Sequence, residues 1–342
     1  MRKLRVMLTC CNIHVKDIIR CFKNNPEGRE VEVFVTNSLE WELPPASECD
    51  GRFVVPRLDD PLFIPTMLKL CKEYSIDAIF PISSIDLDIM SEHRADFEAI
   101  GTKVSILPFE TLSLANDKIR LHERFGELHM PDQIVPLDSQ DVREFAKKHD
   151  NHICCKLADL CGGKGFAVVD DEKCDDVTLF HRFGQKHFIS LDQLCRIVDK
   201  GGHEVILQEY KKGLDYTVSL LANNGKVERI CGYVGYLLEF GSIMYGEIKP
   251  NEAAFEIARK LVAGLNLDGN IGIDYILHDD GTVSLLEINP RINASLPFVA
   301  EAGCNMMYLR LKQLMGESIE GLDETTKTGF KMKKYFATRY FE

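Results

Sequence analysis

The sequence lacks the features that define several large classes of protein. No apolar run approaches the roughly 20 residues that a membrane-spanning helix needs, and the first residues, MRKLRVMLTCCNIH, lack the apolar core and cleavage site of a signal peptide. Positive charge is also scarce, with 41 Lys and Arg against 53 Asp and Glu and a formal net charge of −12. We therefore expect a cytoplasmic protein whose main partner is neither a membrane nor a nucleic acid.

The cysteines lack the spacing of a disulfide framework or a zinc site, although there are 12 of them. No Cys-x-x-Cys occurs, and Cys10-Cys11 and Cys154-Cys155 are adjacent pairs inside apolar runs. Buried, reduced thiols are the favoured interpretation. Cys161 is the exception, because it adjoins a glycine loop; it could sense oxidants there, although a packing role is favoured.

The order of predicted elements divides the chain into three segments. Residues 1–115 alternate short apolar strands with amphipathic helices, which predicts a Rossmann-like parallel sheet with helices on both faces. The first turn of this segment lacks the G-x-G-x-x-G fingerprint, so a dinucleotide-dependent oxidoreductase is disfavoured. Residues 116–208 indicate a small mixed domain with an irregular stretch at 171–190, and residues 209–342 indicate antiparallel strands. The predicted fold class is α/β followed by α+β.

An acidic hairpin is the most informative feature of the last segment. In GIDYILHDDGTVSLLEINPRINAS, Asp280-Gly281 between two strand-like runs predicts a two-residue type I′ turn. Asp274 then lies opposite Glu287, and Asn289 shares their face because strand side chains alternate. Like charges in this arrangement destabilise a sheet unless they bind a hard cation, and Mg²⁺ prefers oxygen ligands. The plain alternative is a hairpin whose charges face water.

The register of this hairpin decides which residues share a face. With a two-residue turn, Ile276 and Leu285 lie on the acidic face, and Ile273, Tyr275, Leu286 and Ile288 lie on the other. Both faces then look covered, which favours cation binding over simple solvation of the acids. A turn one residue longer would shift the register and spoil the pairing of the two carboxylates.

Two further segments carry residues suited to phosphates and nucleosides. Lys156 precedes a turn between two strands that contains Gly162, Gly163, Lys164 and Gly165. Glycines let backbone N–H groups approach an anion closely, but a plain glycine hairpin is favoured when this segment is taken alone. Glu209 ends an apolar strand and Asp215 begins the next, which fits either a purine and ribose site or an ordinary connection.

Arg291 lies four residues after Glu287, in the stretch EINPR. Its guanidinium could bind a phosphate or carboxylate through two parallel hydrogen bonds. The intervening proline restrains the backbone between Asn289 and this arginine.

In their order along the chain, these features resemble the ATP-grasp superfamily, and specifically its carbamoyl-phosphate-synthase-like and biotin-carboxylase-like carboxylate ligases. The resemblance runs nearly end to end. It includes IDAIFPISSIDLDIMSEHRADFEAIG, which is similar to the pre-grasp domain of that superfamily, and NDKIRLHERF, which carries its helix-leading Asp-Lys. The Glu-x-Asn-Pro-Arg of LLEINPR is the most specific motif. The resemblance implies a pre-ATP-grasp domain at 1–115, a small lid subdomain at 116–208 and a large subdomain at 209–342.

The resemblance also implies roles for particular residues. Toward ATP, the residues expected to bind the phosphates are Lys118 and Lys156, and the loop that covers the phosphates contains Gly162, Gly163, Lys164 and Gly165. Adenine is expected to contact Glu209 and Tyr210, and ribose is expected to contact Asp215. Those toward Mg²⁺, or Mn²⁺ in its place, are Asp274, Glu287 and Asn289. Arg291 and Lys156 are the implied catalytic residues. The loop departs from the family pattern, because Leu157 follows the lysine where proline is common and because the loop has one glycine fewer than the richest versions.

The activity that the resemblance implies is an ATP-dependent ligase. Such an enzyme phosphorylates a small carboxylate to an acyl phosphate, which an amine or thiol then attacks. A carbamoyl-phosphate- or carboxyphosphate-forming enzyme is one alternative, and a catalytically silent ATP-binding regulatory module is another. The partners expected are the carboxylate and amine substrates, with a homodimer allowed.

Overall fold

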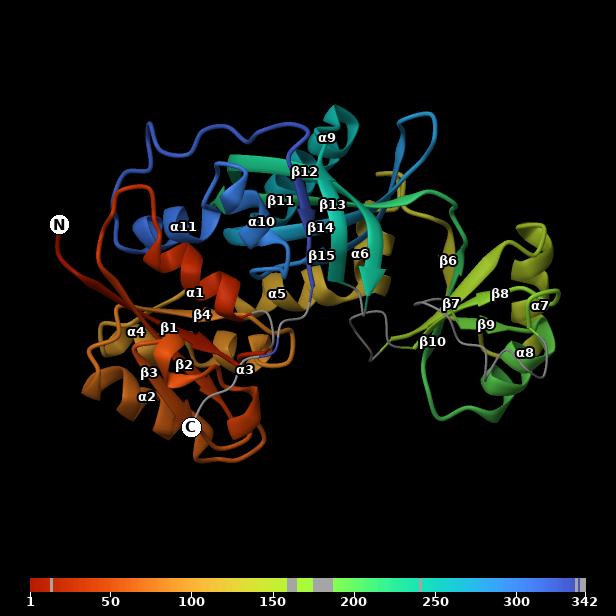
Figure 1. Ribbon diagram of the computed structural model, residues 1–342. Helices are drawn as coiled ribbons and strands as arrows, with labels where there is room; N and C mark the ends of the chain where they lie inside the picture. Colours follow the sequence, from red (N-terminus) through yellow and green to blue (C-terminus); the bar gives the residue numbers. More distant parts are fainter. Residues whose placement is uncertain (13–14, 159–164, 175–186, 240–241, 336–337, 339–342) are drawn as a thin grey trace.

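Three β-sheets organise the protein, and each is built from one stretch of the chain (Figure 1). The first is parallel, the second mixed and the third antiparallel, in the order that the sequence predicted. The computed structural model describes residues 1–12, 15–158, 165–174, 187–239, 242–335 and 338.

The first sheet is the predicted parallel sheet, with strands ordered β3-β2-β1-β4-β5. Its region contains β1 (Leu4–Thr9), α1 (Val15–Lys23), β2 (Val31–Asn37), two short 3₁₀ turns (Glu40–Glu42 and Ala46–Glu48), β3 (Gly51–Val54), α2 (Phe63–Glu73), β4 (Ala78–Pro81), α3 (Leu87–Glu92), α4 (Arg94–Ala99) and β5 (Lys103–Val104). Met7 shares a core with α2, α3 and α4, whereas Val6 and Leu8 share a core with α1. Helices therefore cover both faces of the sheet, as a buried parallel sheet requires.

The second sheet is small and has a core of its own. After α5 (Phe109–Asn116) and α6 (Lys118–Phe125) come β6 (Gln133–Ile134), α7 (Ser139–Lys148), β7 (Ile153–Leu157), β8 (Phe166–Val169), β9 (His187–Ile189), α8 (Leu191–Lys200) and β10 (Val205–Glu209). The strands are ordered β6-β10-β7-β8-β9, and α7 and α8 pack against them. Asp138 caps α7, and Ser190 with Gln193 forms a capping box on α8, so both helices begin where local sequence signals are strong.

The third sheet is antiparallel and has helices on both faces. Its region contains β11 (Leu214–Asn223), β12 (Lys226–Glu239), β13 (Ser242–Ile248), α9 (Glu252–Leu265), β14 (Gly269–Leu277), β15 (Val283–Asn289), α10 (Leu296–Glu301), α11 (Met306–Leu314) and β16 (Lys331–Lys333). The strands are ordered β15-β14-β11-β12-β13-β16. Asn224-Gly225 forms the predicted two-residue turn between β11 and β12, with φ +46° and +80° as a type I′ turn requires.

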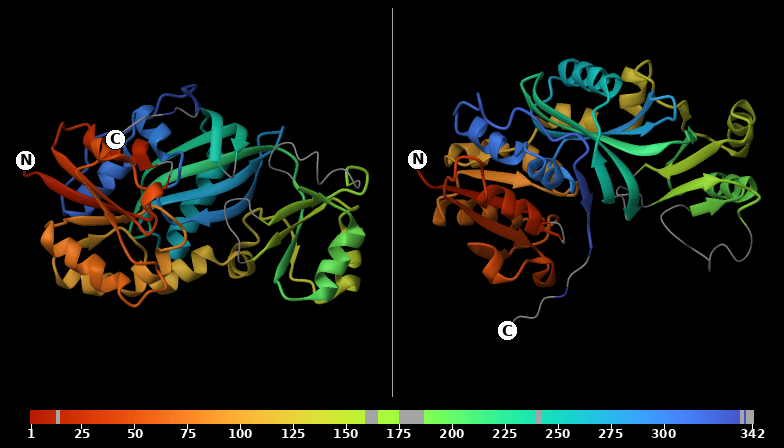
Figure 2. Two further views of the ribbon diagram at one scale, coloured as in Figure 1. Left: turned by 60° about the horizontal axis from the view of Figure 1, so that its bottom comes forward. Right: turned by 45° about the horizontal axis from the view of Figure 1, so that its top comes forward.

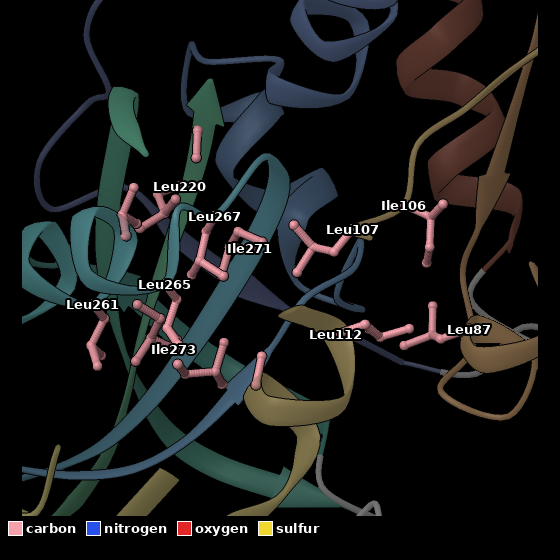
Figure 3. Packing of buried hydrophobic residues seen from close by; sticks show 14 of the residues in the cluster. Leu87, Ile106, Leu107, Leu112, Leu220, Leu261, Leu265, Leu267, Ile271 and Ile273 are labelled. Carbon is pink, nitrogen blue, oxygen red and sulfur yellow. The ribbon is translucent and has the colours of Figure 1, made fainter. Parts of the chain in front are cut away.

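One continuous core joins the third sheet to α5 and to the first sheet's helices. Leu261 and Leu265 of α9 pack against Leu220 and Ile273 of the sheet, and the same cluster extends through α5 to α3 (Figure 3). The helices α5 and α6 therefore pack with the third sheet rather than with the small second sheet. The second sheet lies at one end of the molecule, with the third sheet between it and the first (Figures 1 and 2).

An ion cluster ties the first sheet's region to α11. We call this group of five residues the joint cluster: Glu27, Arg29, Tyr308, Lys312 and Glu317. Arg29 Nη1 lies 2.7 Å from Glu317, and Lys312 Nζ lies 2.8 Å from Glu27. The side chains of Arg29 and Lys312 are only 4% and 7% exposed, so these pairs are shielded from bulk water.

The described cysteines are free, and most are buried. Burial raises the pKa of the Cys154 thiol to about 11, which keeps it protonated and unreactive at neutral pH. The prediction of buried thiols is thus confirmed for the described residues, while Cys161 and most of the stretch at 171–190 lie outside them.

In the described part of the chain, no helix has both the length and the apolar character to cross a bilayer. We keep the domain boundaries after residues 115 and 208 as a proposal. The three sheets fall in the three segments, except that β10 ends at Glu209.

Candidate active site

The β14–β15 hairpin brings the two predicted carboxylates face to face. Asp274 pairs with Glu287, and Gly272 pairs with Asn289, so this part of the predicted register is confirmed. The predicted two-residue turn is wrong. The amide N–H of His278 donates to the carbonyl of Thr282, which leaves a loop of three residues, Asp279 to Gly281.

A β-bulge reconciles the longer loop with the predicted pairing. Next to the loop, Tyr275 pairs with Leu285, and the register shifts between Asp274 and Tyr275 so that Leu286 has no partner. The bulge absorbs the extra residue and returns Asp274 to its place opposite Glu287. It also moves Leu285, predicted on the acidic face, to the face of Tyr275, where it is fully buried in the core under α9.

Asp274 is held by two hydrogen bonds and repelled by a neighbouring charge. Its Oδ1 accepts from the Thr217 hydroxyl at 2.7 Å, and its Oδ2 accepts from Asn289 Nδ2 at 2.8 Å. Burial and the charge of Glu287 raise the pKa of the Asp274 carboxyl to about 7, against the opposing effect of the Thr217 bond. A carboxylate held in such a place releases its proton readily once a cation arrives.

Lys118 brings positive charge to Glu287. It is the first residue of α6, whose N-cap Asp117 accepts from the backbone N–H groups of Ile119 and Arg120. This cap fixes where the helix begins, and the Lys118 Nζ lies 3.7 Å from Glu287 Oε2. Lys118, which the sequence predicts to bind phosphate, therefore lies beside Glu287, a predicted metal ligand from a distant part of the chain.

Arg291 links the hairpin to the first sheet. Its Nε donates to the Ser84 hydroxyl at 2.8 Å, its Nη1 to the carbonyl of Ile292 at 3.1 Å, and its Nη2 lies 3.4 Å from Asn289 Oδ1. Ser84 follows β4, so the guanidinium lies between the acidic face and the carboxyl edge of the parallel sheet. The amide of Asn289 thus contacts Asp274 with its nitrogen and Arg291 with its oxygen.

The connection between the second and third sheets contains the residues predicted to bind the nucleoside. The amide N–H of Tyr210 donates to the carbonyl of His152 at 2.9 Å, and that of Glu209 donates to the carbonyl of Asp132 at 2.9 Å. The Glu209 carboxylate pairs with Lys211, a partner that the sequence did not suggest. Asp215 is exposed on β11, two residues before Thr217 and on the same side of the strand.

Two protein-family models match separate segments of this chain. Residues 202–336 match the family described as ATP-grasp in the biosynthetic pathway with Ter operon, and residues 6–105 match the PylC-like N-terminal domain. The carboxyl-terminal part of the chain is thus similar to an ATP-grasp domain, and its amino-terminal part is similar to a PylC-like N-terminal domain. The first match contains the acidic hairpin and Arg291, and the second contains the parallel sheet and Ser84.

Curated proteins are also similar to parts of this chain. The carbamoyl phosphate synthase large chain of Archaeoglobus fulgidus is 24% identical over 250 residues, covering 69% of this chain and 22% of that protein. The arginine-specific large chain of Bacillus subtilis is 23% identical over 247 residues, covering 67% and 21%. This chain thus spans about a quarter or less of the length of these two relatives.

Two solved ATP-grasp structures illustrate the shared fold. The biotin carboxylase domain of Hydrogenobacter thermophilus 2-oxoglutarate carboxylase, solved with MgADP and bicarbonate, has a TM-score of 0.69 and 16% identity, covering 97% of this chain and 74% of that one. The L-amino acid ligase of Bacillus licheniformis has a TM-score of 0.62 and 16% identity, covering 92% and 75%. At this identity the likeness shows the fold.

The second sheet contains Lys156, and Gly165 directly precedes its strand β8. Lys156 is half-buried in β7 and pairs with Ile206 and Phe166. Gly165 has φ +72°, a left-handed conformation that favours glycine, and its carbonyl accepts from the N–H of Leu157 at 3.2 Å. Gly162, Gly163, Lys164 and Cys161 lie outside the described residues.

The donor set at the hairpin suits a hard cation better than a transition metal. Among the described residues, no group of three or more His, Cys, Asp or Glu side chains could hold a metal. A cation here would have the two carboxylates and the Asn289 oxygen, all hard donors, and would need phosphate oxygens or water besides. That requirement fits Mg²⁺ bound together with a nucleotide.

Sequence reasoning missed three residues of this site, namely Thr217, Lys211 and Ser84. Thr217 could not be identified from the sequence, because its contact with Asp274 depends on the pairing of β11 with β14, which no local pattern specifies. Ser84 could have been suspected, since it follows a strand of a parallel sheet, and such carboxyl ends commonly line ligand sites.

Proposed function

We propose that this protein is a Mg²⁺-dependent ligase that uses ATP to activate a carboxylate as an acyl phosphate for attack by an amine. The single observation that carries the proposal is the half-buried pair Asp274–Glu287, with Lys118 beside it and Arg291 at its edge. The match of residues 202–336 to an ATP-grasp family and the likeness in fold to an L-amino acid ligase support the reaction class. The specific carboxylate and amine are not part of the proposal.

The proposed nucleotide site lies between the second and third sheets. Lys118 and Lys156 would offset the charge of the phosphates, with Gly162, Gly163, Lys164 and Gly165 as the covering loop. Glu209 and Tyr210 would contact adenine at the connection between the sheets, and Asp215 would accept from the ribose hydroxyls. Closure of the lid sheet would exclude water, which otherwise hydrolyses the acyl phosphate.

The proposed metal ligands are Asp274, Glu287 and Asn289, and a bound Mg²⁺ would neutralise charge on the transferring phosphoryl group. The bond from Asn289 Nδ2 to Asp274 leaves the Asn289 oxygen as the donor for this role. Thr217 orients the Asp274 carboxylate from the other side. These bonds fix the ligands before nucleotide arrives, which lowers the reorganisation that binding requires.

The chemistry follows from the charges of the site. A substrate carboxylate oxygen attacks the γ-phosphorus of ATP, the bond to the ADP oxygen breaks, and an acyl phosphate forms. The amine nitrogen then attacks the acyl carbon, phosphate leaves with the C–O electron pair, and the nitrogen loses a proton. Arg291 would hold the carboxylate and stabilise the negative charge that grows on its oxygen in the second step.

The test is ADP release by the purified protein with Mg²⁺ and pools of amino acids and other small acids. Hydroxylamine should trap the acyl phosphate as a hydroxamate in the presence of the correct carboxylate. Absence of both ADP release and ATP binding with every pool would refute the proposal. Bicarbonate-dependent turnover without an amine would favour the carboxyphosphate-forming alternative, and tight ATP binding without turnover would favour a regulatory module.

Several expectations from sequence stay predictions. They are the replacement of Mg²⁺ by Mn²⁺, a homodimer, the absence of nucleic-acid binding and a cytoplasmic location. The dimer has one parallel, since the biotin carboxylase domain of the H. thermophilus enzyme is described as a dimer.

A further inference from the structure

The loop after β4 reaches the candidate active site from a separate domain. Ser84 lies in this loop, and its hydroxyl accepts the Nε–H of Arg291 at 2.8 Å across a separation of 207 residues. β4 lies next to the central strand β1, and the strand order reverses between them, because β2 and β3 lie on one side of β1 whereas β4 and β5 lie on the other. Ligands bind preferentially at such a point of an open parallel sheet, outside the carboxyl ends of its strands.

These contacts form a continuous line from the first sheet to the acidic hairpin. Ser84 accepts from Arg291, Arg291 approaches the Asn289 oxygen, and the Asn289 nitrogen donates to Asp274. The geometry of the guanidinium thus depends on a residue outside the matched ATP-grasp region, which begins at residue 202.

We propose that Ser84 positions Arg291, so that the amino-terminal domain completes the active site. The argument is one of preorganisation. A free arginine side chain samples many rotamers, and a guanidinium displaced by about 1 Å can slow a reaction by about a hundredfold. The Ser84 oxygen restrains the Nε edge of the guanidinium while its Nη groups face the hairpin. The inference rests on the proposed role of Arg291 at the substrate carboxylate.

The first test compares Ser84→Ala with Ser84→Thr. We expect Ser84→Ala to lower kcat about tenfold or more with the KM for ATP unchanged, because Arg291 acts on the carboxylate and not on the nucleoside. Ser84→Thr keeps the acceptor oxygen and should retain most of the activity. A role in packing alone would instead leave kcat of folded Ser84→Ala protein at the wild-type value, and that result would overturn the proposal.

A neighbouring serine supplies the control. Ser83→Ala removes a half-buried hydroxyl that accepts from the N–H of Ile85 at 3.5 Å, and this variant should behave as wild type. Equal losses of kcat in Ser84→Ala and Ser84→Thr would overturn the proposal.

A measurement independent of turnover separates this inference from the proposed function. If the wild-type protein releases no ADP with any pool, the proposed function fails, and the contact is tested by urea unfolding of Ser84→Ala, Arg291→Met and the double variant. Coupled residues should give a double variant whose midpoint falls by less than the sum of the two single changes. Additive midpoints would show that Ser84 does not hold Arg291.

Discussion

The acidic hairpin and the joint cluster both place charges out of bulk water, but with opposite results. In the joint cluster each acid meets a base, and the bond from Lys312 holds the pKa of the Glu27 carboxyl below its usual range. On the hairpin two acids face each other, and burial together with Glu287 raises the pKa of Asp274 to about 7. Pairs of opposite charge stabilise the native state, whereas like charges that face each other on a sheet destabilise it unless a ligand of opposite charge binds.

The difference shows how a structural charge group can be distinguished from a functional one. The joint cluster lies between α11 and the first sheet's region. Its acids already pair with bases, so it does not require a ligand to balance its charges. On the hairpin, Lys118 lies 3.7 Å from Glu287 and the charge of Arg291 acts to lower the pKa of Asp274, yet that pKa stays raised. Perturbed carboxyl groups of the second kind are candidates for binding or catalysis.

The largest expected effect is on turnover in Glu287→Gln. We expect ADP release to fall at least about a hundredfold, because the variant removes the charge that is proposed to hold Mg²⁺ while keeping the shape of the side chain. The assay is Mg²⁺-dependent ADP release at saturating ATP. Asp279→Asn, in the exposed loop of the same hairpin, removes one negative charge elsewhere and should retain wild-type turnover. Substantial activity in Glu287→Gln would show that the charge of Glu287 is not required for catalysis.

The next effect is on stability in Glu317→Ala. This variant leaves the guanidinium of Arg29, which is 4% exposed, without its carboxylate. Since Glu317 itself is about one third exposed, we expect a loss of about 2 kcal/mol, less than for a fully buried pair. Urea unfolding measures it, with exposed Glu320→Ala as the matched control. Turnover per folded molecule should not change, and equal midpoints for both variants would contradict the structural role.

A smaller effect is the pH dependence of stability without nucleotide or metal. The folded pKa of Asp274, about 7, lies above its unfolded value, so the folded protein holds this proton more tightly. Its stability should therefore decline as the pH rises from about 4 to about 7. Glu287→Gln removes one cause of the shift, so the variant should gain up to about 1 kcal/mol over wild type, with the gain appearing as the pH rises. A difference in unfolding midpoint that is constant with pH would be inconsistent with this account.

The smallest effect is the acid sensitivity of the joint cluster. The folded pKa of Glu27 is lowered by its bond to Lys312, so the stability it contributes is present above its unfolded pKa and lost as the pH falls through the lowered value. Glu27→Gln should therefore be less stable than wild type by about 0.5–1 kcal/mol at pH 7 and should approach it below about pH 4. Midpoints at pH 7 and pH 3 would check this, and a gap that widens in acid would reverse the assigned sign.

Local patterns predicted the elements but failed at one turn for an identifiable reason. Asn224-Gly225 has both residues at positive φ and forms the expected two-residue turn. At the other hairpin only Gly281 has positive φ, while the Asp280 carboxylate accepts from the N–H of Thr282 at 2.9 Å and from its hydroxyl. This local bond favours the three-residue loop, and the bulge at Leu286 then restores the pairing of the acids.

By itself, the sequence determined the order of the three sheets, the hairpin that pairs Asp274 with Glu287, and the family motif that ends at Arg291, because these depend on periodicity and on residues close together in the chain. Only the tertiary structure decided that Lys118 meets Glu287, that Thr217 and Asn289 orient Asp274, and that Ser84 meets Arg291. Such contacts join segments up to 207 residues apart. They follow from how sheets and helices pack against one another, which short-range spacing does not encode.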